Sequence, residues 1–266
     1  MSWIEALILG VIQGLSEFLP ISSSGHLVIG KELFGLTTQG ASFEVVVHTA
    51  TVLSTLTIFG KEIVKILKGA VSFSYNKEIQ YVIMILLSML PILVVGFFFK
   101  AQVESVFGSG LVIVGCMLLV TAMLLLVAHF LSTKRMSLPL SFTDAFIIGF
   151  AQAVAVVPGL SRSGATISVG LMLGKDRAEV AKFSFLMVLI PILGEAFLDL
   201  IKGDFAPNAS GIRTGVLLIG FFAAYLSGLA ACSWMISLVK RAKLWGFALY
   251  CSIVGAFCLF YHFFTL

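Results

Sequence analysis

One short stretch of this chain carries most of the side chains that could do chemistry. Residues 13–26 read Gln-Gly-Leu-Ser-Glu-Phe-Leu-Pro-Ile-Ser-Ser-Ser-Gly-His, so a carboxylate, three consecutive hydroxyls and an imidazole interrupt an apolar region. A serine can act as a nucleophile, a histidine as a base or an acid, and a carboxylate can bind a cation. The proline and glycine also break a helix and free backbone groups that need a partner. The stretch is therefore a candidate site.

Glu17 follows Gln13 by four residues, which puts both side chains on one face of a helix. There they could hold a hard cation such as Mg²⁺ or Ca²⁺, or Glu17 could instead orient His26. His26 is a candidate base or acid, or else a satisfied polar contact. The three consecutive hydroxyls are candidate nucleophiles, and one is expected only to cap the next helix: Ser22, Ser23 and Ser24.

A second polar stretch, residues 158–166, reads Pro-Gly-Leu-Ser-Arg-Ser-Gly-Ala-Thr. Arg162 cannot lose its charge, so within a membrane it needs an anionic partner or a wet cavity. It could form a structural ion pair with Glu17, or it could bind phosphate, whose oxygens match the planar guanidinium. Gly164 lets the backbone approach a ligand at the start of a helix. Three nearby hydroxyls add hydrogen-bond donors, namely Ser161, Ser163 and Thr166.

The rest of the chain determines how these stretches are held. Hydrophobic residues make up 59% of the chain, charged residues 11%, and the mean hydropathy is +1.10. The apolar segments are continuous, which predicts an all-α, polytopic helical membrane protein and not a barrel. The net charge of +4 is modest, and we expect membrane lipids and not nucleic acid as partners. The four cysteines lie in apolar segments and are expected to be small buried hydrophobes. No basic segment precedes the first apolar stretch, so no cleaved signal is expected.

Two pairs of apolar segments are too short to cross a bilayer, which takes about 20 residues. Residues 3–19 and 25–35 flank the first polar stretch, and residues 141–157 and the piece ending at Gly174 flank the second. Each pair predicts a re-entrant helical hairpin. About six transmembrane helices are expected elsewhere, over residues 43–60, 79–99, 105–133, 179–201, 214–239 and 244–266. The loop after residue 60 carries several lysines and is partly amphipathic.

The two hairpins align on one another with a shift of 139 residues. The shift superimposes Gln13 on Gln152 and Ser22 on Ser161. Because three spans follow each hairpin, the second copy must enter the membrane upside down. We therefore predict a single membrane domain over 1–266, built from repeat 1 (about 1–135) and repeat 2 (about 140–266), with the two hairpin tips meeting inside.

Basic residues predict the orientation. Four lie on the side of the N-terminus and twelve on the other side: Lys31, Lys100, Lys202 and Arg213 against Lys61, Lys65, Lys68, Lys77, Lys134, Arg135, Lys175, Arg177, Lys182, Lys240, Arg241 and Lys243. By the positive-inside rule the second side is cytoplasmic, so both termini and the mouth of the first hairpin face outward.

Other ionisable residues within apolar segments are also candidates. Glu44 and His48 share a helix face, as do Glu195 and Asp199. Both pairs lie near the ends of predicted spans, so they could take a direct part or simply reach the membrane interface.

The two polar stretches closely resemble the motifs of the undecaprenyl-diphosphate phosphatase (bacitracin-resistance) family, and the resemblance extends over the full chain. It implies an enzyme of the bacterial inner membrane that converts undecaprenyl diphosphate to undecaprenyl phosphate, the carrier for peptidoglycan synthesis, using a divalent cation. By resemblance Glu17, Ser23, His26 and Arg162 are the catalytic residues. Many family members carry a second glutamate where this chain has Gln13.

Two mechanisms remain open. Ser23 could attack the terminal phosphorus with help from His26 and form a phosphoserine, or Glu17 or His26 could activate water while Ser23 only binds. In both, Arg162 and the cation neutralise the transferring phosphoryl group. The alternative function is a transporter or flippase of an anionic prenyl-phosphate lipid, since inverted repeats with broken helices also occur in transporters. A homodimer is left open.

Overall fold

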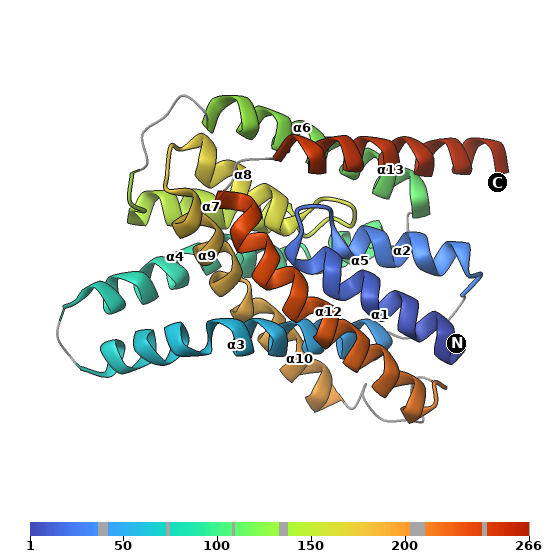
Figure 1. Ribbon diagram of the computed structural model, residues 1–266, viewed down its shortest axis with the longest axis horizontal. Coiled ribbons are helices and arrows are strands. Elements are labelled where there is room, and N and C mark those ends of the chain that lie inside the picture. The colour runs from blue at the N-terminus through green and yellow to red at the C-terminus, as the bar shows by residue number, and fades with distance from the viewer. Residues whose placement is uncertain are drawn as a thin grey trace.

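The computed structural model describes residues 1–36, 42–72, 75–107, 110–132, 138–202, 211–240 and 244–265 (Figure 1). Within these ranges the regular structure is helical, apart from one parallel bridge between Leu138 and Lys175. The helices are α1 (Trp3–Phe18), α2 (Ser23–Leu33), α3 (Ser42–Val71), α4 (Lys77–Phe98), α5 (Lys100–Phe107), α6 (Gly110–Ser132), α7 (Phe142–Val154), α8 (Arg162–Met172), α9 (Arg177–Met187), α10 (Leu189–Lys202), α12 (Thr214–Lys240) and α13 (Leu244–Thr265).

Five of these helices are long and apolar enough to cross a membrane: α3, α4, α6, α12 and α13. The predicted all-α, multi-pass membrane protein is therefore confirmed. Helix α3 is longer than the expected span over 43–60, because it continues to Val71 and carries Lys61, Lys65 and Lys68 on its last turns. Lysine and glutamate are good helix formers, and no proline or turn sequence stops the helix before that point.

The expected span over 179–201 is not one continuous helix. Helix α9 ends at Met187, Val188 lies in a turn, and α10 begins at Leu189. Pro191 has no backbone N–H to donate to the carbonyl of Met187, and its ring crowds that carbonyl. The break therefore lies one turn before the proline.

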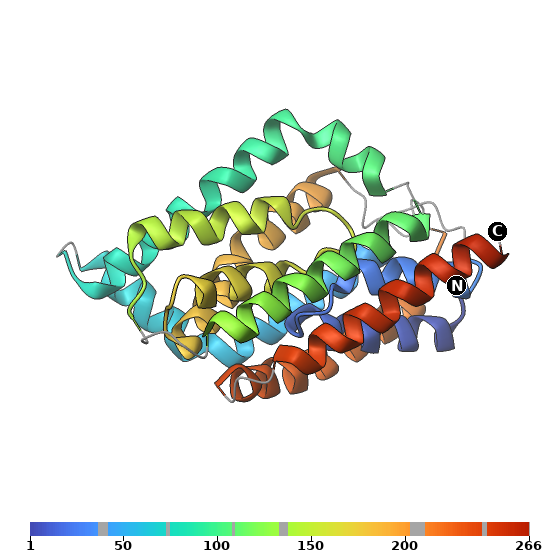
Figure 2. The ribbon, with the colours of Figure 1, turned by 90° about the horizontal axis from the view of Figure 1, so that it is seen from above.

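The two short helix pairs enter the molecule from opposite ends. In Figures 1 and 2, α1 and α2 form a hairpin that starts at the end carrying both chain termini, whereas α7 and α8 form a hairpin from the other end. The C-terminal end of α3 and the start of α4 lie at that other end as well. The two hairpins thus have the predicted half-length form, while the division of the chain into two repeats stays a prediction.

Small residues let each hairpin pack closely on a long helix. A Cβ added to Gly10 of α1 would lie 2.5 Å from the carbonyl oxygen of Gly220 in α12, and one added to Gly149 of α7 would lie 2.3 Å from that of Ser88 in α4. Helices α6 and α13 cross in the same way at Gly115 and Gly255. Such close backbone approach replaces the hydrophobic driving force that is missing between helices in lipid.

Candidate active site

The tips of the two hairpins are in direct contact. The hydroxyl of Ser163, in the first turn of α8, donates a hydrogen bond to the backbone carbonyl of Leu19 at 3.1 Å. Gly25 lies against Gly159, so that a Cβ on Gly25 would be only 3.0 Å from the Cα of Gly159. Side chains at this crossing would push the tips apart. The tips therefore meet inside the molecule, as the sequence predicts.

A serine caps the helix that leaves each tip. The Oγ of Ser22 accepts a hydrogen bond from the backbone N–H of Gly25 at 3.3 Å, and the Oγ of Ser161 accepts one from Gly164 at 3.0 Å. Ser22 is thus the capping serine expected among the three. Its φ of 70° is in the left-handed region, which costs about 1–3 kcal/mol for a residue other than glycine. The remaining N–H groups of both first turns have no partner within their own helix and favour an anion nearby.

The two tips and α3 enclose a cavity of about 150 Å³. This volume is much larger than a single water molecule needs. The polar side chains around it come from both hairpins and from α3. Those that could act on a ligand are Glu17, Ser22, Ser23, Ser24, Glu44, His48, Ser161, Arg162 and Ser163.

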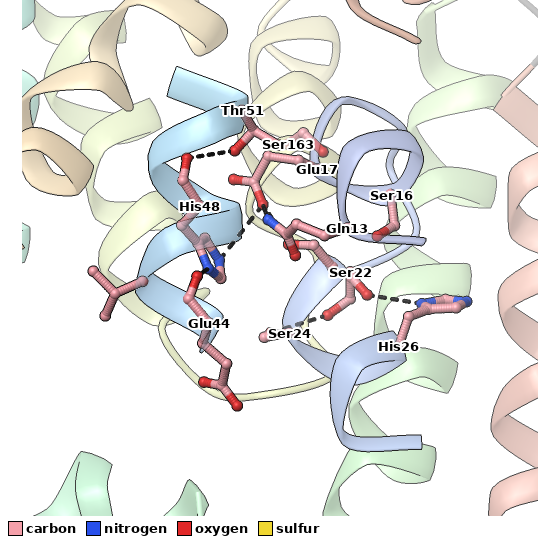
Figure 3. Close-up of polar contacts among 12 residues, drawn as sticks. Gln13, Ser16, Glu17, Ser22, Ser24, His26, Glu44, His48, Thr51 and Ser163 are labelled. Atoms are coloured by element: carbon pink, nitrogen blue, oxygen red, sulfur yellow. Dashed lines mark hydrogen bonds and ion pairs between the residues drawn. The ribbon is translucent and has the colours of Figure 1, made fainter. Parts of the chain in front are cut away.

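Glu17 is the best-connected of these side chains (Figure 3). Its Oε2 accepts a hydrogen bond from the hydroxyl of Ser23 at 2.6 Å and another from the amide nitrogen of Gln13 at 2.8 Å. The side chain is 10% exposed. A short bond from a serine hydroxyl to a nearly buried carboxylate is the arrangement in which the carboxylate can take the hydroxyl proton.

Arg162 begins α8 and its side chain lines the same cavity. Among the described residues, no carboxylate forms an ion pair with its guanidinium. The structural ion pair considered from the sequence is therefore not formed. The guanidinium remains available to an anionic ligand, beside the N-terminus of its own helix.

Thr166 lies outside the cavity and supports the turn that carries Arg162. Its hydroxyl donates to the backbone carbonyl of Arg162 at 2.8 Å and lies 2.5 Å from the hydroxyl of Ser184 in α9. It is 1% exposed, so it is not placed to contact a ligand in the cavity. Ser24 does line the cavity, with its Oγ 3.4 Å from that of Ser22.

His26 points away from the cavity, toward α13. Its Nδ1 lies 2.8 Å from the carbonyl oxygen of Ser22, and its Nε2 lies 2.8 Å from the hydroxyl of Tyr250, on whose ring it stacks. It is not among the residues around the cavity, and Figure 3 shows it on the far side of α2 from Glu17. The structure therefore does not bring His26 together with Glu17 and Ser23. Position along the sequence could not reveal this, since residues three apart in a helix lie near one face, whereas Ser23 bonds to Glu17 and His26 bonds to Tyr250.

His48 lies where the sequence suggested His26. Its Nε2 is 3.7 Å from Oε2 of Glu17, and it lines the cavity from α3. Glu44, one turn earlier, also lines the cavity and forms an ion pair with Lys31 of α2. The sequence signals for this pair were ionisable side chains within an apolar segment and a spacing of four residues. The side chains of Glu195 and Asp199 lie outside the described residues.

The oxygen atoms of Glu17 and Gln13 could bind a hard cation whose remaining ligands come from phosphate and water. The described residues contain no group of three or more His, Cys, Asp and Glu side chains that could hold a metal ion. The Oε1 of Gln13, however, is buried without a hydrogen-bond partner, one turn from the Glu17 carboxylate. Mg²⁺ is commonly held by one or two carboxylates together with phosphate oxygens and water. An amide and a carboxylate oxygen suit such an ion.

Comparison with known proteins adds independent findings. The model of the family described as bacitracin resistance protein BacA matches residues 6–257. A protein of Bacteroides fragilis (strain YCH46) named undecaprenyl-diphosphatase is 58% identical over 259 residues, which cover 96% of each chain. Proteins of the same name from Christiangramia forsetii and Oceanobacillus iheyensis are 48% and 34% identical, and the matches cover 96% and 97% of this chain and 96% of each relative.

Proposed function

The chain belongs to the bacitracin resistance protein BacA family, and we propose that it is an undecaprenyl-diphosphatase. It removes the terminal phosphate of undecaprenyl diphosphate and leaves undecaprenyl phosphate, the lipid carrier for cell-wall synthesis. By returning the carrier to use, the enzyme confers resistance to bacitracin. The full-length likeness to three relatives of that name supports this substrate.

The main structural support for this reaction is the hydrogen bond from the Ser23 hydroxyl to Glu17. Both residues line the same cavity as Arg162. Phosphoryl transfer through a covalent intermediate uses a nucleophile, a base that takes its proton, and positive charge on the phosphoryl oxygens. Here Ser23, Glu17 and Arg162 could supply them. A transporter of the same lipid would need an anion-binding arginine but no serine activated by a carboxylate. The contact therefore supports hydrolysis over transport.

The chemistry runs in two steps. Ser23 Oγ attacks the terminal phosphorus while Glu17 takes the hydroxyl proton; the bond from phosphorus to the bridging oxygen breaks and undecaprenyl phosphate leaves. Water then attacks the phosphoserine and the bond from phosphorus to Oγ breaks. Glu17 returns its proton to Oγ, both hydrogens of the water leave with the released phosphate, and the serine hydroxyl and the carboxylate are restored. Arg162 and the first-turn N–H groups of α2 and α8 bind the phosphoryl oxygens and neutralise their charge throughout.

Glu17 and Gln13 would hold a divalent cation, Mg²⁺ or Ca²⁺, together with oxygens of the diphosphate. When bound, such an ion neutralises charge on the phosphate groups. The unpartnered Oε1 of Gln13 supports this assignment.

The protein resides in the bacterial inner membrane, with its termini and the cavity mouth on the outer side. The excess of lysine and arginine on the side opposite the termini supports this orientation. Undecaprenyl diphosphate released on the outer face would then reach the cavity directly.

Phosphate release by the purified, detergent-solubilised protein tests the function. With a prenyl diphosphate and Mg²⁺, wild type is expected to release phosphate, whereas Ser23→Ala, Glu17→Gln and Arg162→Ala lose most of the activity; His26→Ala run in parallel measures the role of that side chain. Acid quench of a reaction with terminally labelled substrate is expected to leave label on Ser23. If no label stays on Ser23 and Ser23→Ala keeps substantial turnover, the attacking group is water activated by Glu17 and not Ser23. No release by wild type, together with lipid movement in vesicles, would favour transport.

A further inference from the structure

The ring of His48 is held in one orientation by its own helix. Its Nδ1 lies 2.8 Å from the backbone carbonyl oxygen of Glu44. A carbonyl oxygen can only accept, so Nδ1 carries the hydrogen of this bond. The opposite edge of the ring then faces Glu17, with Nε2 at 3.7 Å from Oε2 (Figure 3). This distance corresponds to an ion pair and not to a hydrogen bond, and the contact is attractive when Nε2 also carries a hydrogen, that is, with the ring as imidazolium. The side chain of His48 is 21% exposed.

Three groups from three different helices converge on one carboxylate oxygen. Gln13 of α1 and Ser23 of α2 donate to Oε2 of Glu17, and His48 of α3 approaches the same atom. The first two belong to the hairpin that also carries Glu17, so they move with it. Of the three, only His48 ties the carboxylate to a long helix outside that hairpin.

We propose that His48 is a positioning residue of the reaction centre: it holds Glu17 so that Oε2 stays directed at the Ser23 hydroxyl. The inference rests on the proposed hydrolysis and identifies which imidazole serves it. His26 cannot take this part, because both of its ring nitrogens are engaged by Ser22 and Tyr250 on the other side of α2. A displacement of about 1 Å in a base relative to its nucleophile can cost about 100-fold in rate, so a group that fixes the carboxylate contributes to turnover through that base.

Kinetics of two substitutions separate positioning from structural support. In His48→Leu the side chain keeps an apolar volume but loses every donor, and kcat is expected to fall about 10- to 100-fold while KM stays within about threefold. In His48→Gln an amide N–H can still reach toward Glu17, and kcat is expected to recover to within about fivefold of wild type. His262→Gln, far along α13, is the matched control and is expected to keep wild-type kinetics. All are measured as phosphate release, with the thermal midpoint of each purified variant.

A double-mutant cycle tests whether His48 acts through Glu17. If it does, His48→Leu causes little further loss in a Glu17→Gln background, because the group that it positions has already been replaced. If Glu17→Gln is too slow for the cycle, the separation of kcat from KM and the recovery in His48→Gln decide alone. Three results would each overturn the proposal. The first is a wild-type kcat in His48→Leu, and the second is additive losses in the double-mutant cycle. The third is an equal loss of kcat in His48→Leu and His48→Gln together with a lowered thermal midpoint. All of these comparisons require that the wild-type protein releases phosphate. If the wild type releases none, the result contradicts the proposed function and not the role of His48.

Discussion

The hydroxyl of Ser163 donates a hydrogen bond to the backbone carbonyl of Leu19, 144 residues earlier in the chain. This bond joins the turn that carries Arg162 to the turn that precedes the three serines. The contact between the hairpin tips therefore fixes the guanidinium of Arg162 relative to the candidate nucleophile, Ser23. Changes at the tips should affect chemistry and stability together, whereas changes within the cavity should affect chemistry alone.

Replacing Arg162 by lysine should not preserve activity. A lysine keeps the charge but cannot bind two phosphate oxygens with one planar group, so kcat/KM is expected to fall about 100- to 1,000-fold. Arg213→Lys, at an exposed arginine before α12, is the control and should leave phosphate release unchanged. Near-normal activity in Arg162→Lys would mean that charge alone suffices.

Gly159→Ala should destabilise the junction of the tips. Gly159 has a φ of 92°, and a Cβ there would lie 2.6 Å from the carbonyl oxygen of Val114. Both strain and overlap are expected to lower the stability by about 1–3 kcal/mol, seen as a lower thermal midpoint in detergent. Gly246→Ala is the comparison, because nothing lies within 4 Å of a Cβ at that position of α13. Equal midpoints for the two variants would contradict the packing described at the tips.

Chelation of divalent cations should abolish phosphate release, and added Mg²⁺ or Ca²⁺ should restore it. Gln13→Leu removes the unpartnered amide oxygen beside Glu17, so the cation concentration for half-maximal activity is expected to rise about 10- to 100-fold. Gln152→Leu is the matched control: this glutamine is equally buried but, unlike Gln13, does not bond to Glu17. An unchanged cation requirement in Gln13→Leu would remove Gln13 from the cation site.

Accessibility of introduced cysteines checks the orientation. In a Cys116→Ser background, Ser2→Cys at the exposed N-terminus should react with a membrane-impermeant maleimide in right-side-out spheroplasts. Lys65→Cys, exposed near the far end of α3, should react only after permeabilisation. The expectation follows from the excess of basic residues on the side of Lys65. The reverse labelling pattern would invert the proposed orientation.

Residue types and their order predict the class of protein, which the structure confirms, and most of the candidate site. Continuous apolar segments with few charges can satisfy their backbone groups in lipid only as helices, so composition predicts the fold class. Glu17, Arg162 and the three consecutive serines were identified from residue type and local context, because charged and hydroxyl side chains in apolar segments need a partner or a function. The family resemblance then singled out Ser23. The half-length of the segments beside them predicted the hairpins.

Only the tertiary structure decided which side chains face one another. His26 is three residues from Ser23, yet it turns to Tyr250 in α13, whereas His48 reaches Glu17 from a helix that begins 25 residues after it. Local periodicity gives the face of a helix on which a residue lies, but the rotation of that helix depends on packing against helices distant in sequence. The break between α9 and α10 could not be predicted from the sequence either. A single proline within an apolar stretch can lie inside a continuous helix, as Pro91 does in α4, or can end a helix. The order of residues specified the chemistry available, and packing selected which groups carry it out.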